Sequence, residues 1–249
     1  MSGGSPRHVA QDDRTRLNRR WDLVAVGILV NACLGTVYSW SIFRAPLEEL
    51  LSLSAAQSGI PYSVFLGAFA FTMPLAGGFV SRFGTRLTLA VGGVLLGAGW
   101  IGAGLSSSLP MMILTYGVVG GVGVGFGYGV PLVVSGSWFP ANRGFAMGVT
   151  LAGFGISPFV TAPLAEFLIR RLGVSSAMIV LGVLFVVVIL LFAPLLRRYG
   201  EDGGALTMRR RAEAESREEQ ADAQPITEGP QLTPADMLRS SRFYGLWIC

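Results

Sequence analysis

Long runs of hydrophobic residues alternate with short polar segments along this chain. Six stretches contain no charged side chain: residues 23–43, 59–80, 87–105, 111–134, 145–165 and 174–196. The shortest holds nineteen residues, which is about 28 Å at the helical rise and close to the ~30 Å hydrocarbon core of a bilayer. The pattern therefore predicts an all-α integral membrane fold of six spanning helices, called span one to span six in chain order.

A cleaved signal peptide is the alternative interpretation of span one, because arginines precede it. Its apolar run exceeds the 7–15 residues of a signal peptide, and no small-x-small cleavage site follows Phe43. We therefore expect span one to remain part of the bundle.

The arginines predict the orientation. The chain has nineteen basic residues, all Arg. With the N-terminus in the cytoplasm, sixteen of them lie in inner segments and three lie outside: Arg44, Arg170 and Arg171. The positive-inside rule thus predicts a multi-pass protein of the cell membrane, with a cytoplasmic N-terminus.

The domain boundaries follow from shifts in composition. Residues 1–21 form a polar N-terminal tail and residues 22–198 the six-span bundle. Residues 199–241 are polar and charged, which predicts a cytoplasmic linker that is helical in part and otherwise disordered. Residues 242–249 begin a new apolar run that is too short to cross a membrane. We expect a truncated seventh helix and a missing C-terminal half.

Composition excludes several classes of protein. Hydrophobic residues make up 51% of the chain and charged residues 14%, whereas about 25% charged is usual in soluble domains. The net charge of +4 does not indicate nucleic-acid binding, since the arginines form no stripe with interleaved aromatics. His8 lies in the tail, and Cys33 and Cys249 lie far apart in apolar surroundings, so we expect no metal site, no cofactor and no disulfide.

Spans two and five carry an internal repeat. PLAGGFVSRFG begins at Pro74 and PLAEFLIRRLG at Pro163, an offset of 89. Two further pairs share that offset, Gly59 with Gly148 and Phe65 with Phe154, and Gly35-x-x-Tyr38 pairs with Gly125-x-x-Tyr128 at an offset of 90. The unit is three helices, so the second copy enters the membrane inverted. Such three-plus-three repeats resemble half of a twelve-helix transporter of the major facilitator superfamily.

A glycine- and arginine-containing segment joins spans two and three. It reads Gly77-x-x-x-Ser81-Arg82-x-Gly84-x-Arg86 and resembles the superfamily motif G-x-x-x-D-R-x-G-x-R, with Ser81 in place of the usual acidic residue. The resemblance implies a gating loop in which Gly84 permits a tight turn and the arginines pair with carboxylates across the two halves. A basic positive-inside loop is the simpler alternative.

Span four is rich in glycine. Gly117, Gly121, Gly125 and Gly129 recur at intervals of four along one ridge, and span four contains no dinucleotide-binding G-x-G-x-x-G in any register. Small residues at this spacing let membrane helices approach closely. The ridge therefore predicts tight helix packing.

Polar and aromatic residues in spans one and four suggest a substrate cavity. Asn31 and Tyr38 share one helical face, whereas Trp40 points elsewhere. An unpaired amide in lipid is costly, so Asn31 should face protein or a water-filled cavity. We expect Asn31, Tyr38, Trp40 and Tyr128 to line the cavity. Interhelical hydrogen bonding by Asn31 and an interfacial aromatic belt that includes Tyr38 and Trp40 are the alternatives.

Three separate motifs give a closer resemblance. WFPANRGFAMG at residues 138–148, G-x-x-Y-x-W-S-x-F in span one and TPADMLRSSRFYGLW at residues 233–247 are similar to the oxalate/formate antiporter family. The resemblance covers residues 22–249 and implies exchange of small organic anions by alternating access. Monocarboxylate transporters share the RG-x-A-x-G segment and are the nearest alternative, although the basic residue expected in their first helix is missing here.

The distribution of charge favours exchange over proton coupling. No Asp or Glu lies between Glu49 and Glu166, and no span has an acidic residue or an Arg in its interior, whereas proton-coupled carriers place titrating carboxylates or histidines inside the membrane. A carboxylate at mid-membrane still needs a compensating charge. The resemblance implies that cationic substrate ligands lie in the missing half. An enzyme is not expected, because nucleophile–base pairs and metal ligands are lacking. A non-transporting membrane sensor remains an alternative.

Overall fold

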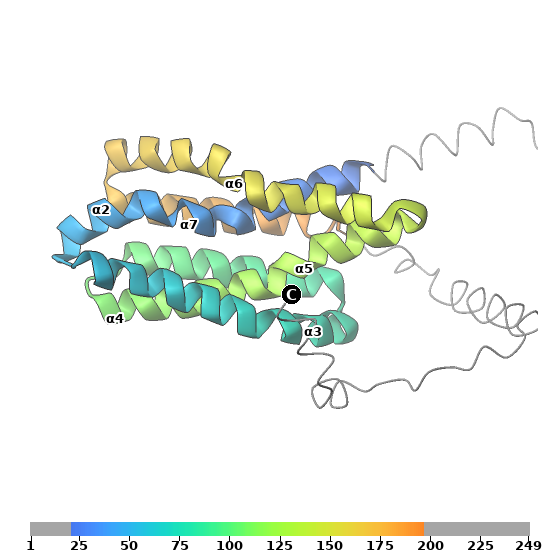
Figure 1. Ribbon diagram of the computed structural model, residues 1–249, viewed down its shortest axis with the longest axis horizontal. Coiled ribbons are helices and arrows are strands. Elements are labelled where there is room, and N and C mark those ends of the chain that lie inside the picture. Colours follow the sequence, from blue (N-terminus) through green and yellow to red (C-terminus); the bar gives the residue numbers. More distant parts are fainter. Residues whose placement is uncertain (1–20, 197–249) are drawn as a thin grey trace, which may run out of the picture. The chain divides into compact units, whose positions relative to one another are not determined.

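The computed structural model describes residues 21–196. The predicted tail up to residue 20, the linker 199–241 and the apolar segment 242–249 lie outside the described residues. Within residues 21–196 every regular element is helical, and the long helices lie side by side as an elongated bundle (Figure 1). The predicted all-α membrane fold is confirmed.

Five helices of the described part are long and apolar enough to cross a membrane. One of them, α3 (Ala55–Gly104), has 50 residues, about 75 Å at the helical rise and more than twice the bilayer core. At Gly84 its backbone leaves the helical region, with φ 82° and ψ 168°. Spans two and three are therefore the two arms of α3, so residues 21–196 contain six helical segments long enough to cross a bilayer.

Span one is longer than its uncharged core. The helix Trp21–Leu51 contains a 3₁₀ segment, η1 (Gly35–Ser39), and then α2 (Trp40–Leu51). It continues past Arg44 and ends at Leu51, and the following Ser52 adopts a left-handed conformation with φ 51°. Ser54 and Gln57 then form a reciprocal capping box that starts span two.

Spans four to six repeat the plan. Span four consists of α4 (Leu109–Met112), the π-helical segment η2 (Ile113–Gly120) and α5 (Gly121–Trp138), followed by the short 3₁₀ turn η3 (Pro140–Asn142). Span five is α6 (Arg143–Leu172) and span six is α7 (Val174–Phe192). Gly173 joins the last two with φ 81° and ψ 164°, the same conformation as Gly84 and 89 positions later.

The contacts between spans identify the repeat positions. Gly35 packs on Phe154 and Ser157 of span five, as Gly121 packs on Phe65 and Ala68 of span two. The partners differ by 89 positions in each case, which agrees with the sequence repeat, but Gly35 and Gly121 differ by 86. A further pair of contacts repeats this shift: Ser39 with Thr161 matches Gly125 with Thr72.

The predicted pairing of Tyr38 with Tyr128 at an offset of 90 is therefore wrong by one helical turn. Glycine recurs about once per turn in span four, and a four-residue slip keeps the same face of the helix. The inverted repeat itself stands, with an offset of 86 for spans one and four and of 89 for spans two and five.

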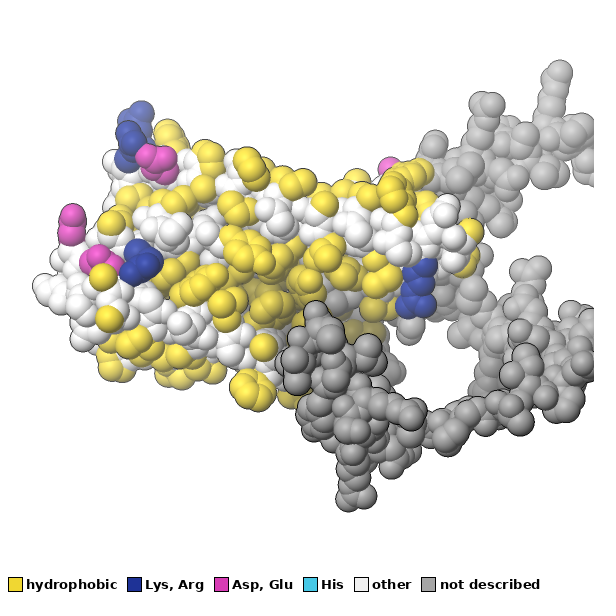
Figure 2. Space-filling model, in the orientation of Figure 1, with side chains coloured by type: hydrophobic (Ala, Val, Ile, Leu, Met, Phe, Trp, Pro, Cys, Tyr) yellow, Lys and Arg dark blue, Asp and Glu magenta, His cyan; other side chains and the backbone are white. Residues whose placement is uncertain are grey.

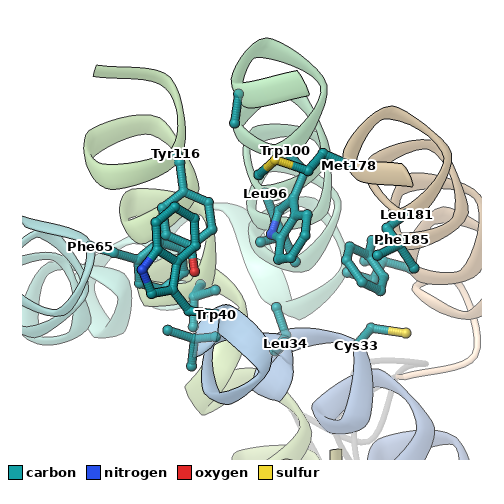
Figure 3. Close-up of a cluster of buried hydrophobic side chains, with 14 of the residues drawn as sticks. Cys33, Leu34, Trp40, Phe65, Leu96, Trp100, Tyr116, Met178, Leu181 and Phe185 are labelled. Atoms are coloured by element: carbon teal, nitrogen blue, oxygen red, sulfur yellow. The ribbon is translucent and has the colours of Figure 1, made fainter. Parts of the chain in front are cut away.

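The surface and the core fit a membrane bundle. Charged side chains of the described residues gather at the two ends of the bundle, and hydrophobic side chains cover the stretch between them (Figure 2). The interior is packed with aromatic and aliphatic side chains from most of the spans, including Leu34, Phe65, Trp100, Tyr116 and Phe185 (Figure 3). This packing holds the helices that carry the candidate site.

Candidate functional site

Four rings from four spans form an aromatic cluster, here called the tyrosine cluster: Tyr38, Phe69, Tyr128 and Phe154. Both tyrosines meet the Phe154 ring edge-on, at centroid distances of 5.4 Å for Tyr38 and 5.0 Å for Tyr128. Phe69 contacts Tyr128 at 5.3 Å and stacks on Phe154 at 6.4 Å. Edge-to-face rings fix one another's orientation. The structure thus brings the two predicted tyrosines together, although they are not repeat equivalents.

The tyrosine cluster is open on one side. Tyr38 is 49% exposed, Tyr128 is partly buried, and Phe154 is buried beneath them. Phenolic hydroxyls donate hydrogen bonds without adding charge. The cluster therefore offers two neutral donors above an apolar floor, which is a geometry suited to the carboxylate end of a small molecule.

Asn31 lies in span one, and its side chain contacts span five. Its side chain is fully buried, and its Nδ2 donates a 3.0 Å hydrogen bond to the carbonyl oxygen of Thr150. Its Oδ1 is buried without a partner among the described residues. The structure places Asn31 in the interhelical hydrogen bond that the sequence left open as an alternative, and its role toward substrate stays a prediction.

Trp40 does not join the tyrosine cluster. It is buried, it stacks on Tyr116 at a centroid distance of 4.2 Å, and its indole Nε1 donates to the carbonyl oxygen of Ser58 at 3.2 Å. Burial also removes it from an interfacial aromatic belt. The predicted place of Trp40 in the cavity therefore needs correction, because the 3₁₀ segment η1 ends just before it and its ring turns into the core.

Three of the four predicted packing glycines touch span two. A methyl group at Gly121 would lie 2.5 Å from the carbonyl oxygen of Phe65. One at Gly117 would lie 3.1 Å from that of Pro61, and one at Gly125 would lie 2.5 Å from Thr72. At Gly129 a methyl group would meet nothing within 4 Å. The close contact of this ridge with span two thus ends at Gly125.

The predicted gating loop is a turn at the end of the bundle opposite α2. Gly77 and Ser81 are exposed near the end of span two, and the Ser81 hydroxyl donates to the carbonyl oxygen of Gly78 at 2.8 Å. Gly84 makes the turn with a backbone conformation that only glycine adopts readily. The tight turn predicted at Gly84 is present.

The two arginines of this loop have different surroundings. Arg82 is exposed, and its guanidinium carbon lies 5.4 Å from the centre of the Phe83 ring. Arg86 is partly buried, and its Nε and Nη2 atoms have no hydrogen-bond partner among the described residues. Arg86 is therefore better placed than Arg82 to form an ion pair with an acidic side chain from outside residues 21–196.

Ionic contacts of the described residues lie at helix ends, away from the tyrosine cluster. Arg44 lies 3.7 Å from Glu48, and Arg170 lies 2.5 Å from Glu166. No group of three or more His, Cys, Asp or Glu residues that could hold a metal occurs in the described part. The site in residues 21–196 is accordingly aromatic and neutral.

Sequence reasoning missed two members of the cluster. In the sequence Phe154 stands out only as the repeat partner of Phe65, and nothing distinguishes Phe69. Both lie in uncharged stretches of spans two and five. A phenylalanine there could equally well contact lipid or line a binding site. Only the packing of the spans distinguishes those positions.

The bundle and its neutral aromatic site define a polytopic helical membrane protein. The sequence profile of the Major Facilitator Superfamily matches residues 23–248. The chain therefore belongs to the Major Facilitator Superfamily, a family of membrane transporters, and the predicted superfamily is confirmed.

The chain is also similar in sequence to individual transporters of this superfamily. The chain is 29% identical to the oxalate:formate antiporter of Oxalobacter formigenes over 232 residues, which is 93% of this chain and 51% of that protein. It is 26% identical to the uncharacterized MFS-type transporter YhjX of Escherichia coli over 72% of this chain and 44% of that protein. It is 28% identical to monocarboxylate transporter 2 of Rattus norvegicus over 58% of this chain and 30% of that protein. The chain spans about half or less of the length of these relatives.

Proposed function

We propose that this chain supplies one half of a secondary transporter that exchanges small carboxylates, of the oxalate or formate kind, by alternating access. The tyrosine cluster carries the proposal, because it presents two neutral donors in a part of the bundle without charged side chains. The similarity to an oxalate:formate antiporter over 93% of the chain supports the same substrate class. We also propose that the protein lies in the cell membrane with its N-terminus in the cytoplasm.

Charge compensation for the substrate would come from a second six-helix half. Two carboxylates of one anion are too costly to hold at mid-membrane with phenol hydroxyls alone. Spans two and five leave faces open for such a partner: a methyl group at Gly59, Gly67, Gly148 or Gly155 would meet nothing within 4 Å. Phe71 and Phe159 are 83% and 81% exposed. Small residues on exposed faces permit close approach of further membrane helices.

Proton-coupled monocarboxylate transport is the second candidate, favoured by the similarity to monocarboxylate transporter 2. The two mechanisms differ in their driving force. Exchange requires a carboxylate on the opposite side of the membrane, whereas cotransport requires a proton gradient and no counter-substrate. The absence of Asp and Glu between Glu49 and Glu166 favours exchange.

The test is radiolabelled oxalate uptake by the complete protein in liposomes. Exchange predicts rapid uptake into liposomes loaded with oxalate or formate and none into empty ones, with or without a proton gradient. Tyr38→Phe or Tyr128→Phe should raise the apparent KM about tenfold, because a hydrogen bond to a charged group is worth about 1.5–3 kcal/mol. Tyr62→Phe, in span two and outside the cluster, is the matched control. Uptake into empty liposomes driven by protons alone would contradict exchange.

A further inference from the structure

Spans one and four both change helix type close to the point where Trp40 contacts Tyr116. Span one passes through the 3₁₀ segment η1 (Gly35–Ser39) just before Trp40, and span four passes through the π-helical segment η2 (Ile113–Gly120) around Tyr116. Mid-helix 3₁₀ stretches often mark hinges, and π-helical turns occur frequently at functional sites. Trp40 and Tyr116 stack on one another, so the two irregular segments meet at one contact.

Tyr116 is held in a cage of rings. Besides its stack on Trp40, its ring lies 4.9 Å from Phe65 and 5.5 Å from Trp100, measured between centroids. Figure 3 shows these rings converging from different spans. Tyr116 is completely buried, so the aromatic packing strongly favours this position of its ring.

The cage leaves two polar atoms unpaired. Neither the Tyr116 hydroxyl nor the Trp100 Nε1 has a hydrogen-bond partner among the described residues, and both atoms are buried. A buried unpaired donor costs free energy that any rearrangement exposing it would recover. Packing and hydrogen bonding therefore oppose each other at Tyr116.

A polar network between α2 and the start of span two holds Trp40 in its stack on Tyr116. The indole of Trp40 donates to the carbonyl oxygen of Ser58, and the Ser58 hydroxyl bonds both Glu48 and the Nε of Arg44. Arg44 also lies close to Glu48. The outer ends of spans one and two are thus tied together, and this tie fixes Trp40 against Tyr116.

We propose that η2 is a conformational switch. While Tyr116 is held in the ring cage, span four stays packed against span one at this end, and this end of the transporter is closed. When the outer ends of spans one and two separate, Trp40 leaves the stack. The π-helical turns of η2 can then tighten toward α-helix, and the Tyr116 hydroxyl reaches a polar partner. This inference rests on the proposed alternating-access function and assigns one of its two states to the conformation described here.

The first experiment substitutes Tyr116→Phe in the complete protein. Removal of an unpaired hydroxyl stabilises the closed state, so the Tm should rise and the maximal rate of oxalate exchange should fall about fivefold with little change in KM. A lower Tm would show that the hydroxyl already has a partner, such as a buried water, and would overturn the inference. This Tm measurement does not depend on transport.

The second experiment measures amide hydrogen exchange of the complete protein in liposomes, with and without saturating oxalate. The switch predicts that protection of residues 113–120 changes at least about threefold with oxalate, because hydrogen bonding there is rearranged, while residues 124–134 of α5 stay constant. Unchanged protection of η2 during measurable carboxylate exchange would overturn the switch alone. A protein that exchanges no carboxylate would instead overturn the proposed function.

Discussion

Gly84 and Gly173 hold the same unusual backbone conformation at the two single-residue turns of the bundle. Their φ and ψ angles lie in a region that is essentially closed to residues with a Cβ atom. A side chain at either position would strain the backbone whatever the space around it. These two residues therefore fix where spans two and five end.

We expect Gly84→Ala and Gly173→Ala each to lower the free energy of unfolding by about 1–3 kcal/mol, the cost of such a conformation for a residue with a side chain. Thermal unfolding of the detergent-solubilised protein measures the effect. Gly129→Ala is the control, since Gly129 is helical and its methyl group would meet nothing. Equal Tm values for all three variants would contradict the proposed strain.

Single residues also show the limit of sequence reasoning. Asn31 is buried, as expected for an amide inside the membrane. Whether it faces a cavity or a neighbouring helix depends on which span packs against it. Trp40 was predicted to line the cavity and lies in the core instead. A one-dimensional pattern gives the face of a helix, whereas the partner of that face depends on contacts 100 or more residues away, such as Asn31 with Thr150.

At the scale of elements, the two repeat-related interfaces are built from different chemistry. Between spans one and five, Ser39 lies 2.5 Å from Thr161, and the Ser157 hydroxyl donates to the carbonyl oxygen of Ala32 at 2.5 Å. Between spans four and two, Gly121 packs on the backbone of Phe65 and Gly125 on the side chain of Thr72. Interhelical hydrogen bonds in membranes are worth only about 0.6–2 kcal/mol each. Close packing therefore carries most of the second interface.

We predict that Gly121→Ala destabilises the bundle by about 1–3 kcal/mol, as overpacking of a tight contact does. The added methyl group would lie 2.5 Å from the carbonyl oxygen of Phe65, so spans two and four would have to separate. Unfolding by denaturant in detergent gives the measurement. Gly129→Ala again serves as control, and an unaltered Gly121→Ala protein would show that the helices separate without cost.

The sequence predicted the elements well and their internal irregularities poorly. All six spans were located because absence of charge over about twenty residues is a strong physical requirement of the bilayer. The segments η1 and η2 were not predicted. In the π-helical segment Gly120 packs closely on Gly99 of span three, and the composition of an apolar run does not reveal such a contact.

At the scale of the whole molecule, the proposed partner face gives a direct test. We predict that Gly148→Trp, on the open face of span five, cuts exchange at least about tenfold by blocking close approach of other helices, without lowering the stability of the six-span unit. Leu191→Trp on span six, where Leu191 is 63% exposed, should leave exchange unchanged. Equal effects of the two variants would place both positions against lipid.

The turn at Gly84 gives a second test of the whole molecule. We expect the double variant Arg82→Gln with Arg86→Gln to reduce exchange severalfold while the protein still inserts into the membrane. Membrane insertion is read from fractionation, and the exchange rate from labelled oxalate. If Arg86 seeks an acidic partner for its unpaired nitrogens, then Arg86→Gln alone should account for most of the loss. Full exchange by the double variant would leave only a topological role for these arginines.

The single-residue turns at Gly84 and Gly173 also constrain how the polypeptide is inserted during biosynthesis. A helix joined to the next by one residue cannot settle across the bilayer independently of it. In the proposed orientation the turn at Gly173 lies outside, so spans five and six should enter together as a hairpin. This hairpin must carry Arg170 and Arg171 through the membrane, whereas Arg82 and Arg86 stay in the cytoplasm. We therefore expect insertion of spans five and six to be the slow step in making this bundle.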